Sequence, residues 1–122
     1  MSKYIMIVDD SATIRQTVKL ILIKSGYEII EANDGKDALN KLNGKKVHLI
    51  ISDVNMPNMD GIALLKEIKK TASHKFVPIM MLTTESQKTK VQEGKLAGAK
   101  AWLVKPFRPE QLLSAVNKLI LP

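Results

Sequence analysis

The chain has 122 residues, a length that fits one domain, and its 45% hydrophobic and 25% charged residues are typical of a soluble globular protein. The absence of cysteine excludes disulfides, thiolate metal sites and thiol nucleophiles, and no apolar run approaches the roughly 18 residues of a membrane helix. The net charge of +7 is not gathered into a tight lysine and arginine cluster or a nucleic-acid reading motif, so a solvated basic surface is favoured over a nucleic-acid site. We expect one cytoplasmic domain over residues 1–122, with no output domain and no membrane or nucleic-acid partner.

Short apolar segments with strand character alternate with segments of helical periodicity along the chain. The first strand is expected at Tyr4–Val8, and the first helix near Ser11–Ser25, where apolar residues recur at helical spacing. Further strands are expected at Glu28–Ala32, Val47–Ser52, Pro78–Thr83 and Ala101–Val104, and further helices after Asn33-Asp34-Gly35, after Asp60, over 86–98 and from Pro109 onwards. Five strands alternating with five helices predict an α/β fold with a parallel sheet, because parallel strands need crossover connections.

Polar residues stand where four of the five expected strands end. Asp9 and Asp10 follow the first strand, and Asp53, Thr83 and Lys105 stand at the ends of the third, fourth and fifth. All these strand ends meet at one edge of a parallel sheet, which is where ligands bind in such folds. Two carboxylates about 5 Å apart repel by about 3 kcal/mol at an effective dielectric constant of about 20, so a cation must offset the repulsion. The candidates are Mg²⁺, which prefers oxygen ligands, and the ammonium group of Lys105.

This set of residues favours phosphoryl transfer to a carboxylate. Asp53 is the preferred nucleophile, because it stands alone before a loop, and its product would be an acyl phosphate. Lys105 would neutralise phosphoryl oxygens and the Thr83 hydroxyl would hydrogen-bond one of them. Each residue also has a plainer reading. The Asp9-Asp10 pair could cap a helix, Asp53 could sit in a turn, Lys105 could be solvated, and Thr83 could pack or cap.

Four segments carry a resemblance to a known family: IVDDS, SDVNMPNMDG, MLTTES and AGAKAWLVKPF. With them the chain resembles, from Ile5 to Leu119, the receiver domain of two-component response regulators, specifically the single-domain CheY-like chemotaxis group. The resemblance implies a flavodoxin-like (βα)5 doubly wound fold with strand order 2-1-3-4-5. It also implies a signalling phosphoacceptor that catalyses only its own phosphotransfer and autodephosphorylation.

The resemblance implies a role for each matched residue. Asp53 would accept the phosphoryl group of a CheA-like histidine kinase, beside Lys105. The implied ligands of Mg²⁺ are Asp10, Asp53, the backbone carbonyl of Asn55 and, largely through water, Asp9. Thr83 and Trp102 would form the switch, although Tyr or Phe is more frequent at position 102, and half-exposed packing is the alternative role of Trp102. Asn55 and Glu85 would modulate the rate of phosphoryl loss, and the Lys105–Pro106 peptide would be cis.

The last third of the chain is expected to carry the output. Residues 86–122 hold seven basic and two acidic side chains, and the 86–98 segment, with Gly94 inside it, is expected to pack weakly. This face would bind an acidic, partly apolar peptide, which in the chemotaxis group would belong to a flagellar motor switch protein. A phosphatase is a further candidate partner. The alternatives are a phosphorelay intermediate or phosphate sink, and an unphosphorylated docking module.

Two other classes with similar architecture fit less well. A flavin-binding module would need a Ser/Thr-rich phosphate loop after the first strand, where this chain has Asp9 and Asp10. A haloacid-dehalogenase-type phosphatase needs a second aspartate two residues after its nucleophile, but Ser11 and Asn55 occupy those places. His48 and His74 lack nearby ligand partners, so surface or packing roles are expected for both.

Overall fold

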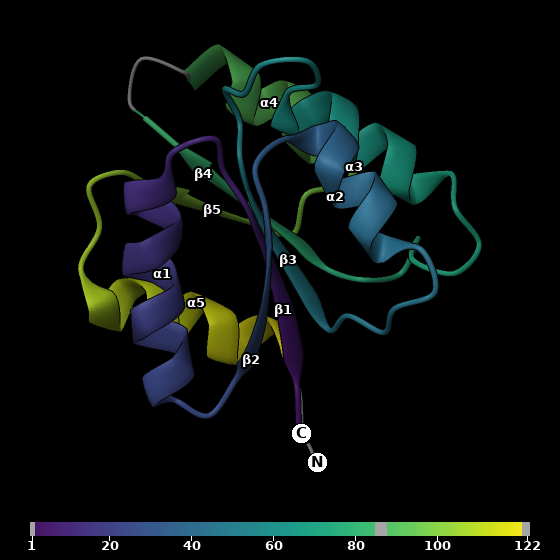
Figure 1. The fold of residues 1–122 in the computed structure, drawn as a ribbon. Helices are drawn as coiled ribbons and strands as arrows, with labels where there is room; N and C mark the ends of the chain where they lie inside the picture. Colours follow the sequence, from purple (N-terminus) through teal and green to yellow (C-terminus); the bar gives the residue numbers. More distant parts are fainter. Residues whose placement is uncertain (1, 85–87, 121–122) are drawn as a thin grey trace.

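The structure is a computed structural model that describes residues 2–84 and 88–120, in which five strands alternate with five helices (Figure 1). The strands are β1 (Tyr4–Val8), β2 (Glu28–Ala32), β3 (Leu49–Asp53), β4 (Ile79–Thr83) and β5 (Ala101–Val104). The helices are α1 (Ala12–Lys24), α2 (Gly35–Leu42), α3 (Gly61–Lys69), α4 (Lys88–Ala97) and α5 (Pro109–Leu119). The predicted alternation of strands and helices is confirmed.

The five strands form one parallel sheet in the order β2-β1-β3-β4-β5, as the resemblance implies. Helices α1 and α5 lie on one face of the sheet and α2, α3 and α4 on the other (Figure 1). The register places Val8 level with Ala32 on β2 and with Ser52 on β3. The carboxyl ends of the strands therefore share one edge, to which the residues after each strand are delivered.

Three helices begin at side-chain caps that satisfy free backbone N–H groups. The Ser11 hydroxyl accepts from the N–H of Ile14 at 3.2 Å, before α1. Asp34 and Asp60 each accept from the N–H three residues later, both at 2.8 Å, before α2 and α3. Such caps stabilise a helix start by about 1 kcal/mol each. They therefore help to fix the residue at which each loop after a strand ends and the next helix begins.

Strand β3 differs from its expected bounds. It begins at Leu49 rather than Val47 and includes Asp53 as its last residue. The backbone N–H of Tyr4 donates to Nδ1 of His48 at 3.0 Å, so the histidine ring takes a donor that the β1–β3 ladder would otherwise use. The regular ladder starts one residue later, where Ile5 pairs with Leu49.

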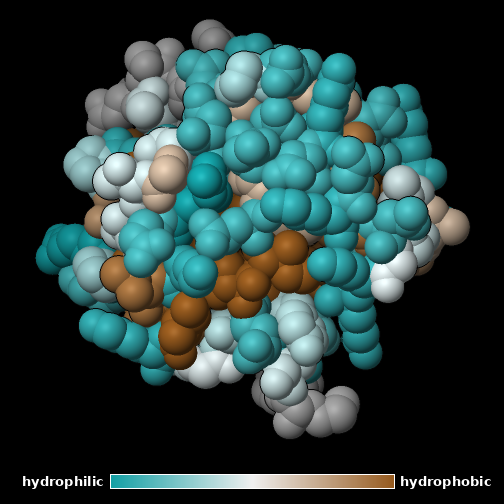
Figure 2. All heavy atoms as spheres, viewed as in Figure 1, coloured by the Kyte–Doolittle hydropathy of each residue, from teal (hydrophilic) through white to brown (hydrophobic). Residues whose placement is uncertain are grey.

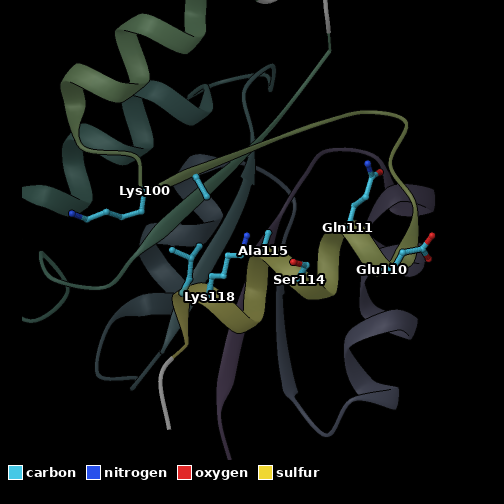
Figure 3. A pocket seen from close by; sticks show the side chains of 8 residues that line it. Lys100, Glu110, Gln111, Ser114, Ala115 and Lys118 are labelled. Atoms are coloured by element: carbon cyan, nitrogen blue, oxygen red, sulfur yellow. The ribbon is translucent and has the colours of Figure 1, made fainter.

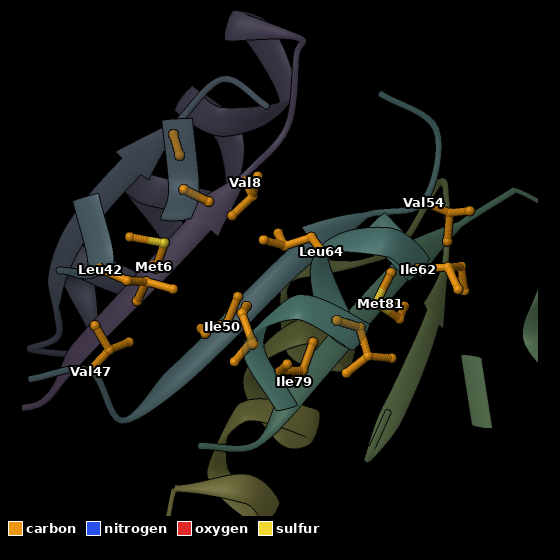
Figure 4. Close-up of a cluster of buried hydrophobic side chains, with 14 residues drawn as sticks. Met6, Val8, Leu42, Val47, Ile50, Val54, Ile62, Leu64, Ile79 and Met81 are labelled. Carbon is orange, nitrogen blue, oxygen red and sulfur yellow. The ribbon is translucent and has the colours of Figure 1, made fainter. Parts of the chain in front are cut away.

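The sheet is buried between two apolar clusters. One cluster packs α2, α3 and the inner side of α4 on the sheet, with Met6, Ile50, Leu64 and Met81 fully buried at its centre (Figure 4). The other packs α1 and α5 on the opposite face, with Leu22 and Val116 fully buried. Burial on both faces explains why the strands read as continuous apolar runs rather than as alternating patterns.

The surface is mainly hydrophilic, with one apolar band across the face seen in Figure 2, over β2 and between α1 and α2. Leu20 and Ile23 are exposed large apolar side chains of α1. Within the described residues, no helix has the length and apolar content needed to cross a bilayer.

Both histidines have packing roles, as expected. His74 is buried, and its Nδ1 and Nε2 atoms lie 2.9 Å from the Ser73 hydroxyl and 2.8 Å from the Lys45 carbonyl oxygen. His48 stacks on the ring of Tyr4, with 6.4 Å between ring centroids.

Candidate functional site

Three carboxylates meet at the carboxyl edge of the sheet. Asp9 and Asp10 directly follow β1, and Asp53 ends the adjacent strand β3. Each offers one oxygen atom, and these oxygens all lie within 4.8 Å of one another. Asp9 and Asp53 are buried, with 1% and 5% of their surface exposed, whereas Asp10 is exposed to solvent. The structure thus brings together the three aspartates that the sequence singled out.

Lys105 reaches the same place from the end of β5. Its Nζ atom lies 3.0 Å from Oδ1 of Asp53, to which it donates a hydrogen bond, and 3.9 Å from Oδ2 of Asp9. The backbone N–H of Lys105 donates to the carbonyl oxygen of Thr83 at 2.6 Å, and the following peptide to Pro106 is cis. The β4–β5 pairing therefore aims this side chain across the strand ends.

The burial of the aspartates makes their negative charges unfavourable. Burial raises the pKa of Asp9 to about 6, although the hydrogen bond from the Ser11 N–H opposes the shift and the charge of Asp53 adds to it. Burial also raises the pKa of Asp53, and the hydrogen bond and charge of Lys105 oppose that shift. One ammonium group thus offsets only part of the cost of holding these charges together.

The donor set fits a hard divalent cation. Oδ2 of Asp9 is buried and has no hydrogen-bond partner among the described residues, although buried carboxylate oxygens usually have one. Together with the oxygens of Asp10 and Asp53 it makes an all-oxygen cluster open to solvent on the side of Asp10, as Mg²⁺ requires when it keeps several waters. Asn55 is exposed on the loop two residues after Asp53, and the role of its carbonyl stays a prediction.

Gly61 holds the loop after Asp53 close to the strand. A Cβ atom at Gly61 would collide with the carbonyl oxygen of Asp53 and with the methyl group of Met81, so only glycine fits at this contact. The Gly61 N–H donates to the carbonyl oxygen of Val54 at 2.9 Å, which closes the loop. Within it Asn58 adopts a φ of 67° and donates from Nδ2 to Oδ2 of Asp34 at 3.0 Å. The sequence reasoning did not single out Gly61.

Arg15 was also missed. Its Nη1 donates to the backbone carbonyl oxygen of Asp9 at 2.6 Å, and its Nε donates to Oε1 of Glu31 at 3.2 Å. Lys19 holds the other oxygen of Glu31 at 3.1 Å. Arg15 therefore braces the turn that carries Asp9 and Asp10. The available signal was an arginine one helical turn after the capping Ser11, on the helix that follows the acidic pair.

The two residues expected to act as a switch lie on the neighbouring strands β4 and β5. Thr83 is buried at the end of β4. Trp102 on β5 pairs with Met81 on β4. Its half-buried side chain packs on the α2–α3–α4 cluster, and the indole ring lies against Gly94 of α4. The indole Nε1 is buried and has no partner in the described part of the chain. Glu85, an expected rate modulator, lies outside the described residues.

A separate cavity of about 520 Å³ lies along α5 and the start of β5 (Figure 3). Ala115 and Leu119 give it an apolar part, and Glu110, Gln111, Ser114 and Lys118 give it a polar part. Figure 3 shows Lys100 extending away from α5. All residues that line the cavity belong to the 86–122 face, and none of the strand-end carboxylates is among them.

A family model described as "Response regulator receiver domain" matches residues 5–117. The chain belongs to this family. It is 40% identical to the chemotaxis protein CheY of Bacillus subtilis over 98% of this chain and 99% of that protein, and 38% identical to CheY of Thermotoga maritima over 98% of both. Among solved structures, it resembles Vibrio cholerae CheY4 with a TM-score of 0.92 and 46% identity, over 98% of this chain and 99% of that one.

Membership of the receiver family identifies the function of the strand-end site. The chain is a receiver-domain phosphorylation switch, homologous to chemotaxis proteins CheY, and a signalling phosphoacceptor rather than a metabolic enzyme. The cluster of Asp9, Asp10 and Asp53 is an acidic cluster of the kind that forms the Mg²⁺ site of receivers.

Proposed function

We propose that Asp53 is the phosphoacceptor and that the donor is the phosphohistidine of a CheA-like histidine kinase. An oxygen of Asp53 attacks phosphorus, and the bond between phosphorus and the imidazole nitrogen breaks. The bonding electrons return to the imidazole ring, which takes up a proton, and an acyl phosphate is left on Asp53. The observation that carries the proposal is the 3.0 Å contact between Lys105 and Asp53 inside a cluster of three carboxylates.

Asp9, Asp10 and Asp53, with the backbone carbonyl of Asn55, would hold Mg²⁺. Bound there, the ion would supply positive charge to the carboxylates and to the phosphoryl oxygens. Lys105 would supply the second positive charge by moving from the Asp53 carboxylate to a phosphoryl oxygen. Burial of Asp53 would limit the access of water to the acyl phosphate.

Thr83 and Trp102 would pass the change to the surface. The Thr83 hydroxyl would turn towards a phosphoryl oxygen, and Trp102 would follow it on the neighbouring strand. The indole already rests against Gly94, so its displacement would bear directly on α4. Asn55 and Glu85 would modulate the rate of phosphoryl loss.

The output would be the 86–122 face of the receiver domain, acting in the cytoplasm. This face includes α4, β5 and α5 and the cavity of about 520 Å³. Its basic residues and exposed Leu96 suit an acidic, partly apolar peptide, such as one from a flagellar motor switch protein. Similarity to chemotaxis proteins CheY favours this target over a phosphate sink.

The deciding experiment measures the intact mass of the protein after incubation with acetyl phosphate and Mg²⁺. We expect one phosphoryl adduct and a change in the fluorescence of Trp102, the single tryptophan. Asp53→Asn and chelation of the metal should each abolish the adduct. Glu110→Gln, which removes an exposed carboxylate that is not part of the three-aspartate cluster, should leave it unchanged. An adduct that persists in Asp53→Asn would exclude Asp53 as the acceptor.

A further inference from the structure

Lysines without ionic partners gather at the edge of the sheet opposite to the carboxylates, where the strands begin. We call the following set the basic pole: Lys3, Lys45, Lys46, Lys69, Lys75 and Lys100. They lie before β1, β3, β4 and β5 or at the end of α3. None of them forms an ion pair with a carboxylate anywhere in residues 2–84 and 88–120, unlike Lys19, Lys41, Lys66 and Lys70.

Contacts between the loops join these lysines into a continuous surface. Nζ of Lys69 donates to the carbonyl oxygen of Lys75 at 3.1 Å. Lys69 is also close enough to Lys100 that, besides partial burial, the charge of Lys100 lowers the pKa of Lys69. On the other side of the pole, burial and then the charges of Lys3 and Lys46 lower the pKa of His48. The six lysines thus concentrate positive charge at this edge, where Glu28 is next to Lys3 but forms no ion pair with it among the described residues.

Two grooves cross the pole and share Lys46. One, of about 380 Å³, lies between the α2–β3 and α3–β4 loops, and the buried His74 fixes its walls through the 2.8 Å contact of Nε2 with the Lys45 carbonyl oxygen. The other, of about 350 Å³, is lined by Lys3, Lys46 and the stacked rings of Tyr4 and His48. Both grooves are large enough for individual side chains of a partner.

Apolar groups lie among the charges. Val47 is buried and Val77 half-buried in the lining of the larger groove. Phe76 is 87% exposed beside it, and Nζ of Lys75 lies 5.1 Å from the centre of its ring. An exposed aromatic side chain next to apolar-lined grooves and unpaired lysines is a combination that marks binding surfaces.

We propose that the basic pole docks an acidic protein segment with interspersed apolar side chains, at a site separate from the 86–122 face. Carboxylates of the segment would pair with Lys45, Lys46 and Lys75, and its apolar side chains would enter the grooves. The grooves favour a peptide over a bilayer, whose surface cannot enter them. The ammonium group of Lys75 already stands over Phe76, which disfavours the stacking of a nucleic-acid base on that ring.

The test uses fluorescence anisotropy with a labelled peptide of repeated Glu-Leu-Glu units. The pole variant combines Lys45→Gln, Lys46→Gln and Lys75→Gln, and we expect it to weaken binding about tenfold at low ionic strength. The control variant combines Lys19→Gln, Lys36→Gln and Lys66→Gln, which removes the same charge outside both the pole and the 86–122 face, and its affinity should stay within about twofold of the unchanged protein. All these lysines lie on the surface, so circular dichroism should show both variants folded.

A second variant tests the apolar contribution without changing charge. Phe76→Ser should weaken the Glu-Leu-Glu peptide but not a peptide of glutamate alone. Equal weakening in the pole and control variants would show a net-charge effect and overturn the proposal, as would unchanged binding in the pole variant. Tighter binding of single-stranded DNA or of phosphatidylserine vesicles than of the peptide, lost in the pole variant, would overturn the choice of a protein partner.

Discussion

The carboxylate of Asp9 is nearly removed from water, and one of its oxygens has no hydrogen-bond partner among the described residues. Because its pKa rises from 3.8 to about 6 on folding, the folded protein binds more protons than the unfolded chain between these values. The contribution of Asp9 to the stability of the metal-free protein should therefore fall as pH rises from about 4 to about 6. Above that range the ionised side chain costs about 3 kcal/mol.

Asp9→Asn should remove this cost. In urea unfolding without metal we expect the variant to be more stable by up to about 3 kcal/mol at neutral pH, and by only about 1 kcal/mol near pH 4.5. The introduced amide side chain keeps an oxygen that can accept from the Ser11 N–H, so the turn should survive. Saturating Mg²⁺ should stabilise the unchanged protein, so the difference in free energy of unfolding between it and Asp9→Asn should become smaller. A variant that is less stable at neutral pH would contradict the assigned cost of the charge.

Arg15 supports the same turn through the carbonyl oxygen of Asp9. Arg15→Lys keeps the charge but loses the fork that joins Asp9 to Glu31, so we expect the dissociation constant for Mg²⁺, followed by Trp102 fluorescence, to rise about tenfold. Lys19→Met is the matched control, because Lys19 also pairs with Glu31 but makes no hydrogen bond to Asp9. An unchanged affinity in Arg15→Lys would show that only the charge of Arg15 matters.

The residues at the strand ends could be predicted from sequence, and those that position them could not. Asp9, Asp10, Asp53 and Lys105 each stand beside a recognisable strand, and parallel topology alone brings them together. Gly61 and Arg15 depend instead on contacts across the fold, with the Asp53 carbonyl and the Asp9 carbonyl. The local sequence places Arg15 one helical turn after Ser11, but it does not indicate which group either residue contacts.

At the scale of elements, α4 lies closely against β5 where Gly94 meets Trp102. The indole of Trp102 fills the space that a side chain at Gly94 would need, and Ile62 of α3 closes it from another side. The sequence predicted a weakly packed helix because of this glycine. In the structure the glycine is buried and lets the helix approach the tryptophan.

Gly94→Ala should disturb this contact. Overpacking costs about 1–3 kcal/mol, whereas replacing glycine by alanine within a helix gains about 1 kcal/mol, so a net loss of up to about 2 kcal/mol is expected. The tryptophan emission should shift as the ring moves. The measurement is urea unfolding followed by fluorescence and circular dichroism. In a Trp102→Phe background, Gly94→Ala should lower the free energy of unfolding by less. Equal decreases in both backgrounds would exclude the contact with Trp102 as the cause.

The start of β3 depends on the side chain of His48 and could not be predicted from the pattern of apolar residues. The apolar run predicts a strand from Val47, but the ring of His48 accepts the Tyr4 N–H and delays the ladder to Leu49. The His48 ring nitrogen accepts a hydrogen bond that a backbone carbonyl would otherwise accept. The pattern of apolar residues in the sequence does not reveal this exchange.

For the whole molecule, the alternation of strands and helices was sufficient to predict a parallel sheet, because parallel strands need crossover connections. Right-handed crossovers leave few arrangements of such a sheet, and the strand order was predicted from the family resemblance. The distribution of charge was not predictable in the same way. By sequence the basic surplus falls in residues 86–122, yet five of the six lysines of the basic pole come from outside that range. They are brought together by loops that lie far apart in the chain and meet only at the edge where the strands begin.

The acidic cluster and the basic pole occupy opposite ends of the strands, so the molecule is an electric dipole aligned with its sheet. Such a dipole turns in the field of a charged partner before contact, and this orientation raises the rate of productive encounters at low ionic strength. A phosphoryl group on Asp53 would add about 1.5 to 2 negative charges at the acidic end. Phosphorylation would then increase the dipole moment as well as change a surface, and the direction from which the protein meets a charged partner would depend on its signalling state.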